Sequence, residues 1–263
     1  MKNIAPSVVL ILICSACFEY NPNQIILDDD EKNLTAKNIA QIQKKPVSNI
    51  IRFALMGDTQ RFYDETKAFV KSINQYDSID FVVHAGDISD FGLVKEFQWI
   101  HELMSEAKFP YLTVVGNHDL LANGRKVYNE IYGKLDYSFE YGNYKFIMLN
   151  TNSREYEFDG TVPDLMWLQN QLEDNPDNKK VIVISHIPPF DGDFDPDLEE
   201  AYATMLSNDP NVILSLHGHR HSFADDEYYD DGVRYFVTTT TQKAGYAIVT
   251  LTTNEAHIET VNY

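Results

Sequence analysis

The second part of the chain contains five short apolar runs, and each run ends at polar residues able to bind a metal ion or a proton. Short runs rich in Val, Ile and Leu, bounded by glycine and polar residues, predict buried strands. The runs and the motifs after them are Ile50–Met56 before Gly57-Asp58, Ile79–His84 before Gly86-Asp87, Tyr111–Val115 before Gly116-Asn117-His118-Asp119, Val181–Ile184 before Ser185-His186, and Val212–Leu216 before His217-Gly218-His219-Arg220-His221.

Segments of helical length separate these runs. Their apolar residues recur at the three- and four-residue spacing of an amphipathic helix, as in Leu93, Phe97 and Ile100. Strands that alternate with helices predict a largely parallel sheet covered by helices. In such a sheet the carboxyl ends of the strands meet at one edge, so the five polar motifs should converge there. The expected helices are Thr66–Tyr76, Leu93–Ala107, Pro163–Leu172 and Leu198–Leu206.

The first residues have the pattern of an export signal. Lys2 precedes the apolar stretch Ile4–Ile13, and Ser15-Ala16 stand directly before Cys17. The stretch is shorter than the roughly 20 residues of a membrane span and is typical of a secretory signal. Small residues before a cysteine resemble the bacterial lipobox, although Cys14 stands where Leu is usual. We therefore expect residues 1–16 to be a lipoprotein signal peptide, Cys17 to be lipidated, and the protein to be exported and anchored to a membrane of the bacterial cell envelope.

The chain has only two cysteines, Cys14 and Cys17, which limits the other interpretations of this segment. A zinc site would need a second cysteine pair, and a redox motif would not lie in an apolar flank. Residues 17–49 are mostly polar and read as a tether, in which Leu34, Ile39 and Ile42 indicate one short amphipathic helix. The folded domain is expected over residues 50–263.

The charge of the chain restricts its partners. Asp and Glu number 40 against 21 Lys and Arg, and the net charge is −19. Such a surface repels a polyanion, so nucleic acid is disfavoured as a partner and a nuclease activity with it.

The residues at the predicted sheet edge favour a metal site. Carboxylate, carboxamide and imidazole groups without thiolates suit Mn, Fe, Zn or Mg. Two ions about 3.5–4 Å apart need a bridging ligand, which a carboxylate can be. A single Asp after a strand is more often a turn or cap residue. Five such motifs in order favour the metal site over that interpretation.

In this order the motifs resemble those of the calcineurin-like metallophosphoesterases: Asp-x-His, Gly-Asp, Gly-Asn-His-Asp/Glu, His, then Gly-His-x-His. The resemblance covers essentially all of residues 50–263. It implies an α/β fold, a four-layer α-β-β-α sandwich of two mixed sheets flanked by helices, with a dinuclear metal centre at one edge. It also implies hydrolysis of phosphoester bonds by a hydroxide held between two divalent metal ions.

The resemblance assigns metal ligands by position. The first ion would take Asp58, Asp87 and His221, with Gln60 where the family usually has a histidine. The second ion would take Asp87, which bridges the two ions, together with Asn117, His186 and His219. A carboxamide oxygen is a weaker ligand than imidazole, so Gln60 makes the first site the weaker one.

Other residues would act on the substrate. The resemblance makes His118 a general acid or a phosphate contact, and makes Asp90 the residue that orients it, although Asp90 also suits the N-cap of the next helix. Arg61 is expected to contact the substrate phosphate or else to form a surface ion pair, and Asn117 lies beside the same phosphate. Phe91 replaces the arginine of the serine/threonine phosphatases, which disfavours protein phosphatase activity.

Four further features receive structural interpretations. His84 and His217 stand beside the motifs as packing residues or as residues that orient ligands. The acidic segment 191–197 does not match a calcium-binding loop, because Pro196 stands where such a loop needs its turn glycine. Its position after His186 instead predicts a mobile lip over the metal site. Residues 225–232 predict a hairpin with a solvated tip.

The expected substrate is a small phosphomonoester or phosphodiester. Gln60 keeps one alternative open, a metal-binding or phosphate-sensing lipoprotein with little turnover.

Overall fold

A computed structural model describes residues 21, 23–253 and 255–263 of the chain. The expected signal peptide 1–16 and Cys17 lie outside the described residues. Among the described helices, none combines the length and the apolar character that a membrane crossing requires.

Eleven strands and six α-helices make up the described part of the chain. The strands are β1 (Ile51–Met56), β2 (Phe81–His84), β3 (Tyr111–Thr113), β4 (Tyr137–Tyr141), β5 (Tyr144–Leu149), β6 (Lys180–Ser185), β7 (Val212–His217), β8 (Ala224–Asp226), β9 (Arg234–Val237), β10 (Gly245–Leu251) and β11 (Ala256–Asn262). The helices are α1 (Leu34–Ile42), α2 (Tyr63–Ile73), α3 (Val94–Ser105), α4 (Gly124–Ile131), α5 (Leu165–Glu173) and α6 (Pro196–Asn208).

The strands form two sheets. One has the order β11-β10-β1-β2-β3 and the other β4-β5-β6-β7-β9-β8. Neighbours β1, β2 and β3 are parallel, and so are β5, β6, β7 and β9, whereas β10, β11, β4 and β8 run antiparallel to their neighbours. The sandwich of two mixed sheets expected from the family resemblance is thus confirmed. The single sheet expected from the apolar runs alone is wrong, because those five strands divide between the two sheets.

Both faces of the central strands are buried, and alternate side chains serve different layers. In β1, Phe53 and Leu55 point between the sheets, whereas Ala54 and Met56 pack under the helices. Phe53 stacks on Phe81 of β2 with ring centroids 5.1 Å apart, and the ring of Phe146 from the opposite sheet meets it edge-on. Because such strands are apolar at nearly every position, their sequence does not reveal which sheet they join.

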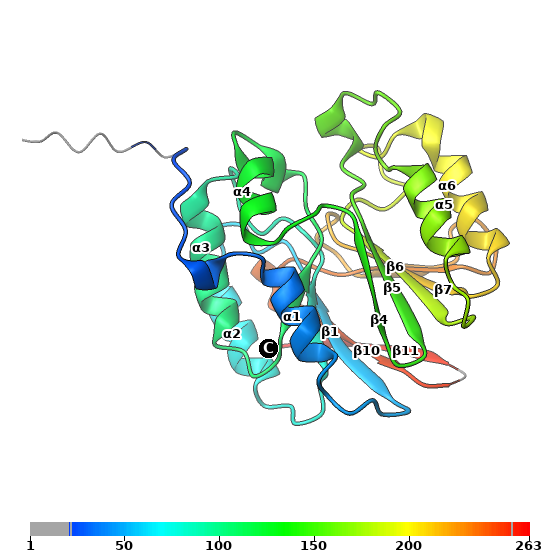
Figure 1. The fold of residues 1–263 in the computed structure, drawn as a ribbon, viewed down its shortest axis with the longest axis horizontal. Coiled ribbons are helices and arrows are strands. Elements are labelled where there is room, and N and C mark those ends of the chain that lie inside the picture. Colours follow the sequence, from blue (N-terminus) through cyan, green and yellow to red (C-terminus); the bar gives the residue numbers. More distant parts are fainter. Residues whose placement is uncertain (1–20, 22, 254) are drawn as a thin grey trace, which may run out of the picture.

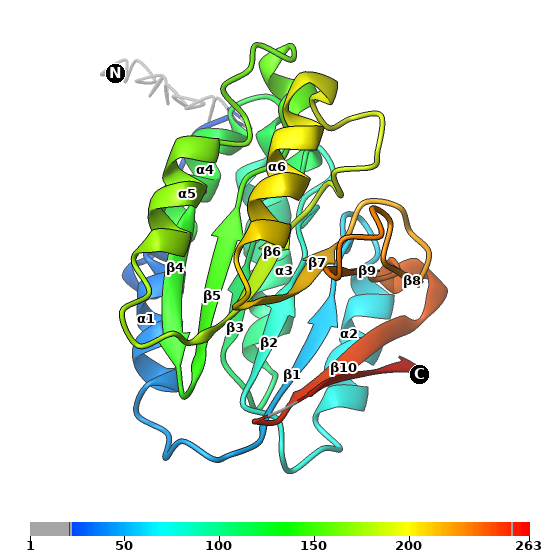
Figure 2. The ribbon, with the colours of Figure 1, turned by 90° about the vertical axis from the view of Figure 1, so that its right-hand side faces the viewer.

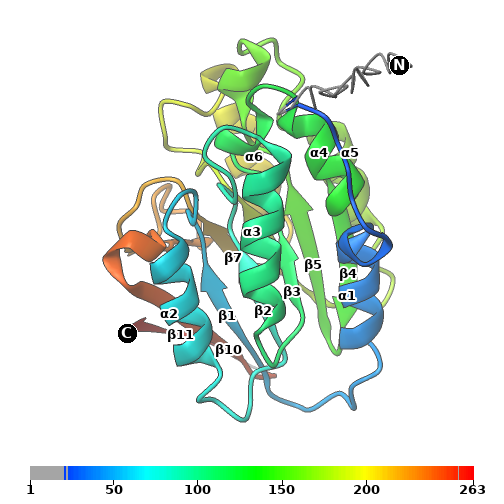
Figure 3. The same ribbon diagram turned by 90° about the vertical axis from the view of Figure 1, so that its left-hand side faces the viewer.

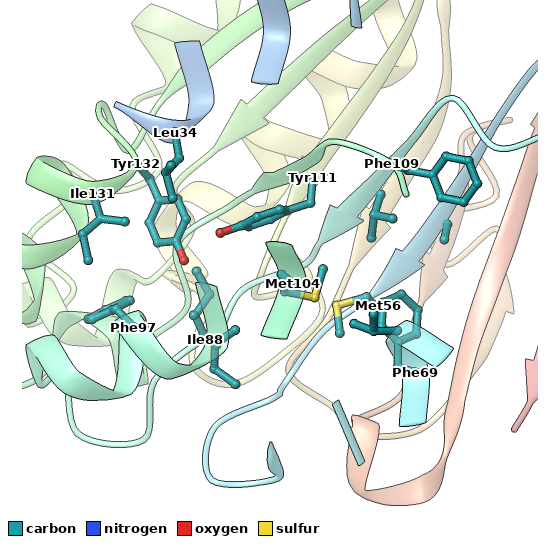
Figure 4. Close-up of a cluster of buried hydrophobic side chains, with 14 of the residues drawn as sticks. Leu34, Met56, Phe69, Ile88, Phe97, Met104, Phe109, Tyr111, Ile131 and Tyr132 are labelled. Carbon is teal, nitrogen blue, oxygen red and sulfur yellow. The ribbon is translucent and has the colours of Figure 1, made fainter. Parts of the chain in front are cut away.

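Helices cover the outer faces of both sheets (Figure 1). Helices α1 to α4 lie over β1–β3 (Figure 3). Phe69, Phe97 and Met104 from these helices pack in one cluster with Tyr111 of β3 and with Tyr132, which follows α4 (Figure 4). Helices α5 and α6 lie over the other sheet (Figure 2), on Leu149, Val183 and Tyr235. The four predicted helices are all present, with ends displaced by a few residues.

Candidate metal site

Five loops bring the motif residues to the carboxyl ends of strands from both sheets. Asp58 and Gln60 follow β1, Asp87 follows β2, and Asn117 follows β3. From the opposite sheet, His186 follows β6, while His219 and His221 follow β7. The site therefore lies across the two sheets, with Asp58, Asp87 and His186 all buried.

Three acceptor atoms converge at the centre of this site. Nε2 of His186 lies 3.3 Å from Oδ1 of Asp87 and 3.1 Å from Oδ1 of Asn117. Nδ1 of the same ring lies 2.6 Å from the carbonyl oxygen of Ala85 and donates its proton there. This bond favours the tautomer in which Nε2 offers a lone pair, as a metal ligand must.

Asp58 provides a second indication of a cation site. Both of its carboxylate oxygens are buried, and neither accepts a hydrogen bond. The nearest basic atom is Nε2 of His221, 3.1 Å from Oδ1. A buried carboxylate without donors is costly unless a charge compensates it. Asp58 and His221, which the sequence assigned to the first ion, are thus paired here.

Gln60 lies in the position of the usual histidine and is buried. Its Nε2 donates a hydrogen bond to Oδ2 of Asp87 over 3.1 Å, and the backbone N–H of His118 donates to Oδ1 of the same carboxylate over 3.0 Å. The carbonyl oxygen of the Gln60 side chain is the only atom of that amide able to bind a cation.

The backbone at the ligands is strained. The φ angles of Asp58, Asp87, His219 and His221 are 54°, 57°, 69° and 54°, and that of Gln60 is 39°. Residues other than glycine rarely adopt such left-handed conformations, which concentrate at functional sites. Part of the support comes from far along the chain, because the hydroxyl of Thr240 donates to the carbonyl oxygen of Asp58 over 2.9 Å. No sequence motif pointed to Thr240.

Two glycines permit the loops to approach one another. A Cβ atom at Gly116 would lie 2.0 Å from the amide nitrogen of Asp87. At Gly86, whose φ is 91°, a Cβ atom would lie 2.6 Å from Nδ1 of His186. Any side chain at either position would therefore push apart the residues that form the centre of the site.

His219 belongs to a different group of side chains. Its ring meets that of His186 edge-on, with centroids 5.1 Å apart. Its Nε2 faces Asp191 and Asp193, each through a carboxylate oxygen 3.5 Å away. The structure thus brings together six of the seven predicted ligands and places the seventh beside the acidic loop.

The predicted substrate-binding residues form a chain at the rim. Nδ1 of His118 lies 2.8 Å from the carbonyl oxygen of Asp90 and 3.6 Å from its carboxylate, which also accepts a hydrogen bond from Arg61 over 3.0 Å. The side chain of Arg61 is 64% exposed. The alternative that Asp90 caps the next helix is wrong, because α3 begins at Val94, with Leu93 in the cap position.

Asp119 and His84 support these loops, a role that the sequence suggested for His84 but not for Asp119. Asp119 is fully buried and accepts hydrogen bonds from the backbone of Ile88, Ser89 and Gly116, so it ties the second loop to the third. Nε2 of His84 lies 2.9 Å from the hydroxyl of Thr59, between Asp58 and Gln60.

The charged groups at the centre stabilise one another. Burial alone would raise the pKa of Asp87, but His186 and His118 hold it well below its usual range. Burial alone would lower the pKa of His186, but Asp87, with help from Asp58, raises that pKa to about 10. A proton on His186 and a cation beside it therefore compete for the same acceptors.

These observations fit a divalent cation. Carboxylate and imidazole ligands from Asp58, Asp87 and His186 lie in one buried cluster, and the half-buried Asn117 lies beside it, with no thiolate among them. Such a set suits Mn, Fe, Zn or Mg.

Comparison with known proteins identifies the fold and the family. The chain is 26% identical over 151 residues to a 3',5'-cyclic-nucleotide phosphodiesterase of Nostoc, covering 54% of this chain and 56% of that protein. It is 27% identical over 159 residues to a probable glycerophosphodiester phosphodiesterase of Arcobacter nitrofigilis, with the same two coverages. It spans between 17% and 56% of the length of three curated relatives.

A solved structure shows the same fold. A dimetal phosphatase from Danio rerio superimposes with a TM-score of 0.66 and 14% sequence identity, over 83% of this chain and 98% of that one. The sequence model of the calcineurin-like phosphoesterases matches residues 51–223, which contain every predicted metal ligand. The chain belongs to the calcineurin-like phosphoesterase family.

Proposed function

We propose that the protein hydrolyses small phosphoesters, phosphodiesters in preference to monoesters, with two divalent ions. The observation that carries this proposal is the convergence of three acceptors: Nε2 of His186 lies 3.3 Å from Oδ1 of Asp87 and 3.1 Å from Oδ1 of Asn117. The names of two relatives, a cyclic-nucleotide and a glycerophosphodiester phosphodiesterase, support the diester preference.

The residues would divide between two ions. Asp58, Asp87, His221 and the carbonyl oxygen of Gln60 would hold the first. Asp87, Asn117, His186 and His219 would hold the second. When bound, the ions would supply a water deprotonated near neutral pH and offset the charge of the phosphoryl group.

The remaining steps belong to side chains at the rim. The Nδ1–H of His118 would donate a hydrogen bond to the carbonyl oxygen of Asp90, and the imidazolium form of the ring would carry on Nε2 the proton that the leaving-group oxygen receives. Arg61, held by the carboxylate of Asp90, would contact a phosphate oxygen from its exposed position, and so would the amide of Asn117.

An assay on the purified protein without residues 1–16, which keeps α1 on the sheet, tests this proposal. Aryl phosphodiesters and aryl monophosphates are offered to protein stripped with EDTA and then to protein reloaded with Mn. We expect turnover only after reloading, and faster turnover of the diesters. Bound metal without turnover would instead favour the phosphate-sensing alternative.

We also propose, from the sequence pattern alone, that the protein is exported and anchored through a lipid on Cys17. Replacing Cys17→Ser should move the protein from the membrane fraction to a soluble exported fraction. Retention in membranes after a carbonate wash would contradict the anchor.

A further inference from the structure

The acidic loop between β6 and α6 lies against a predicted ligand of the second ion. Oδ1 of Asp191 and Oδ2 of Asp193 both lie 3.5 Å from Nε2 of His219. No other ring nitrogen among the predicted ligands has two carboxylates from outside the central cluster beside it, within the described residues.

This loop is fixed in place rather than being a free acidic segment. Arg154 donates to both carboxylate oxygens of Asp193, over 2.9 and 3.3 Å, and its backbone N–H donates to the carbonyl oxygen of the same residue. Phe194 is buried in the core under α6. The amide N–H of Asp193 donates to Oδ1 of Asp191 over 3.2 Å. The two carboxylates therefore have one preferred position relative to His219.

The charges around the loop are balanced. Nε of Arg220 lies 3.7 Å from Oδ2 of Asp191, and Arg154 pairs with Asp193. Asp191 therefore lies between Arg220 and His219, and Asp193 lies between Arg154 and His219. A further cation is not needed to compensate the two carboxylates.

A neutral imidazole carries its proton on one nitrogen and offers a lone pair on the other. Carboxylates that face Nε2 stabilise the proton there, which leaves Nδ1 as the nitrogen able to bind an ion. Carboxylates beside the second nitrogen of a metal-binding histidine orient the ring and increase its basicity, and their loss typically weakens metal binding about 10–100-fold.

We propose that Asp191 and Asp193 are positioning residues, which hold the Nε2–H tautomer of His219 so that Nδ1 faces the second ion. This inference rests on the proposed function for the ion, whereas the tautomer is a property of the metal-free protein. The tautomer of His186 is fixed in the opposite way: the carbonyl oxygen of Ala85 holds the proton of that ring on Nδ1, which leaves Nε2 to bind an ion.

The test compares the double variant Asp191→Asn/Asp193→Asn with Asp197→Asn, an exposed acid at the start of the following helix. Nitrogen-15 NMR of the metal-free proteins, above neutral pH, reports which ring nitrogen of His219 carries the proton. We expect the Nε2–H form in the wild type and in Asp197→Asn, and a mixture of tautomers in the double variant. The proposal would be overturned if His219 of the wild type carried its proton on Nδ1, or if the double variant gave the same spectrum as the wild type.

Calorimetric titration with Mn gives a second readout. The affinity of the second ion, which His219 would bind, should fall about 10–100-fold in the double variant and remain unchanged in Asp197→Asn. Circular dichroism and thermal unfolding confirm that each variant is folded. If the double variant does not fold, Asp191→Asn alone should give a smaller change of the same sign.

A third arm distinguishes a positioning role from a separate cation site. In the double variant Asp58→Asn/Asp87→Asn, Mn should bind weakly at every site of the protein. The reason is that Asp191, Asp193 and His219 do not bind an ion by themselves. Mn binding that persists there and disappears when Asp191 and Asp193 are also replaced would overturn the proposal. The tautomer result stands whether or not the protein hydrolyses phosphoesters, so the two claims fail separately.

Discussion

The Nδ1–H of His186 donates to the carbonyl oxygen of Ala85 over 2.6 Å, and this bond joins the two sheets at the metal site. Ala85 follows β2 in one sheet, and His186 follows β6 in the other. The bond turns Nε2 of His186 toward Asp87, so the packing of the sheets also determines which nitrogen can bind a cation.

The first prediction concerns pH and the metal-free protein. The pKa of His186 is raised from 6.5 to about 10, so its proton stabilises the native state fully below pH 6.5 and less as the pH rises toward 10. We therefore expect the free energy of unfolding of EDTA-treated protein to fall between about pH 7 and about pH 9.

Urea unfolding of metal-free wild type and His186→Gln measures this effect. The variant should lack the fall over the same pH range. If both proteins show the same dependence on pH, the proton on His186 does not stabilise the fold.

The second prediction separates proton transfer from metal binding. His118 faces the carbonyl oxygen of Asp90 and is not among the predicted metal ligands. His118→Ala should keep the metal content of the wild type and lose about 10²–10⁴-fold in turnover. The loss should be smallest for leaving groups that need little protonation, such as nitrophenolate.

An exposed histidine, His257, provides the control, and His257→Ala should retain wild-type rates. Equal losses for all leaving groups in His118→Ala would assign that residue to phosphate binding instead. Loss of metal along with the rate would remove it from both roles.

The third prediction concerns Gln60, which donates to Oδ2 of Asp87 over 3.1 Å. An amide oxygen is a weaker and harder ligand than imidazole, so the first ion should bind less tightly than the second and should favour Mn or Mg over Zn. Gln60→His should tighten the first site and shift it toward Zn. Calorimetry on metal-free protein would contradict this if wild type and variant showed two equally tight sites.

The sequence was most informative where a strand ends. Each apolar run followed by Gly-Asp, Gly-Asn-His or a histidine was a strand that delivers that residue to the site, because carboxyl ends of parallel strands meet at an edge. The division into two sheets came only from the family resemblance. Phe53 and Ala54 are both apolar, and nothing in their order shows that one faces a second sheet and the other a helix.

Contacts between loops that lie far apart in the chain could not be predicted from the sequence pattern. The hydroxyl of Thr240 reaches Asp58 from 182 residues later, and its run of threonines carries no metal-binding signal. Asp191 and Asp193 were predicted only as part of a lip, because their approach to His219 depends on how Arg154 and Phe194 fix the loop. Asp119 differs from these residues, because it is part of the motif Gly-Asn-His-Asp. The motif identified the residue but did not show that it binds the backbone of two loops.

The most direct test of the account measures metal content and turnover together in Asp87→Asn. Asp87 receives hydrogen bonds from Gln60 and His118 and lies 3.3 Å from His186, and the account makes it the ligand shared by both ions. A carboxamide has one coordinating oxygen and no charge to offset two dications. The exposed acid Asp77 supplies the matched control, Asp77→Asn. The account predicts two ions per chain and full activity in wild type and Asp77→Asn, and a large loss of both ions and of activity in Asp87→Asn. Two bound ions with normal turnover in Asp87→Asn would contradict it.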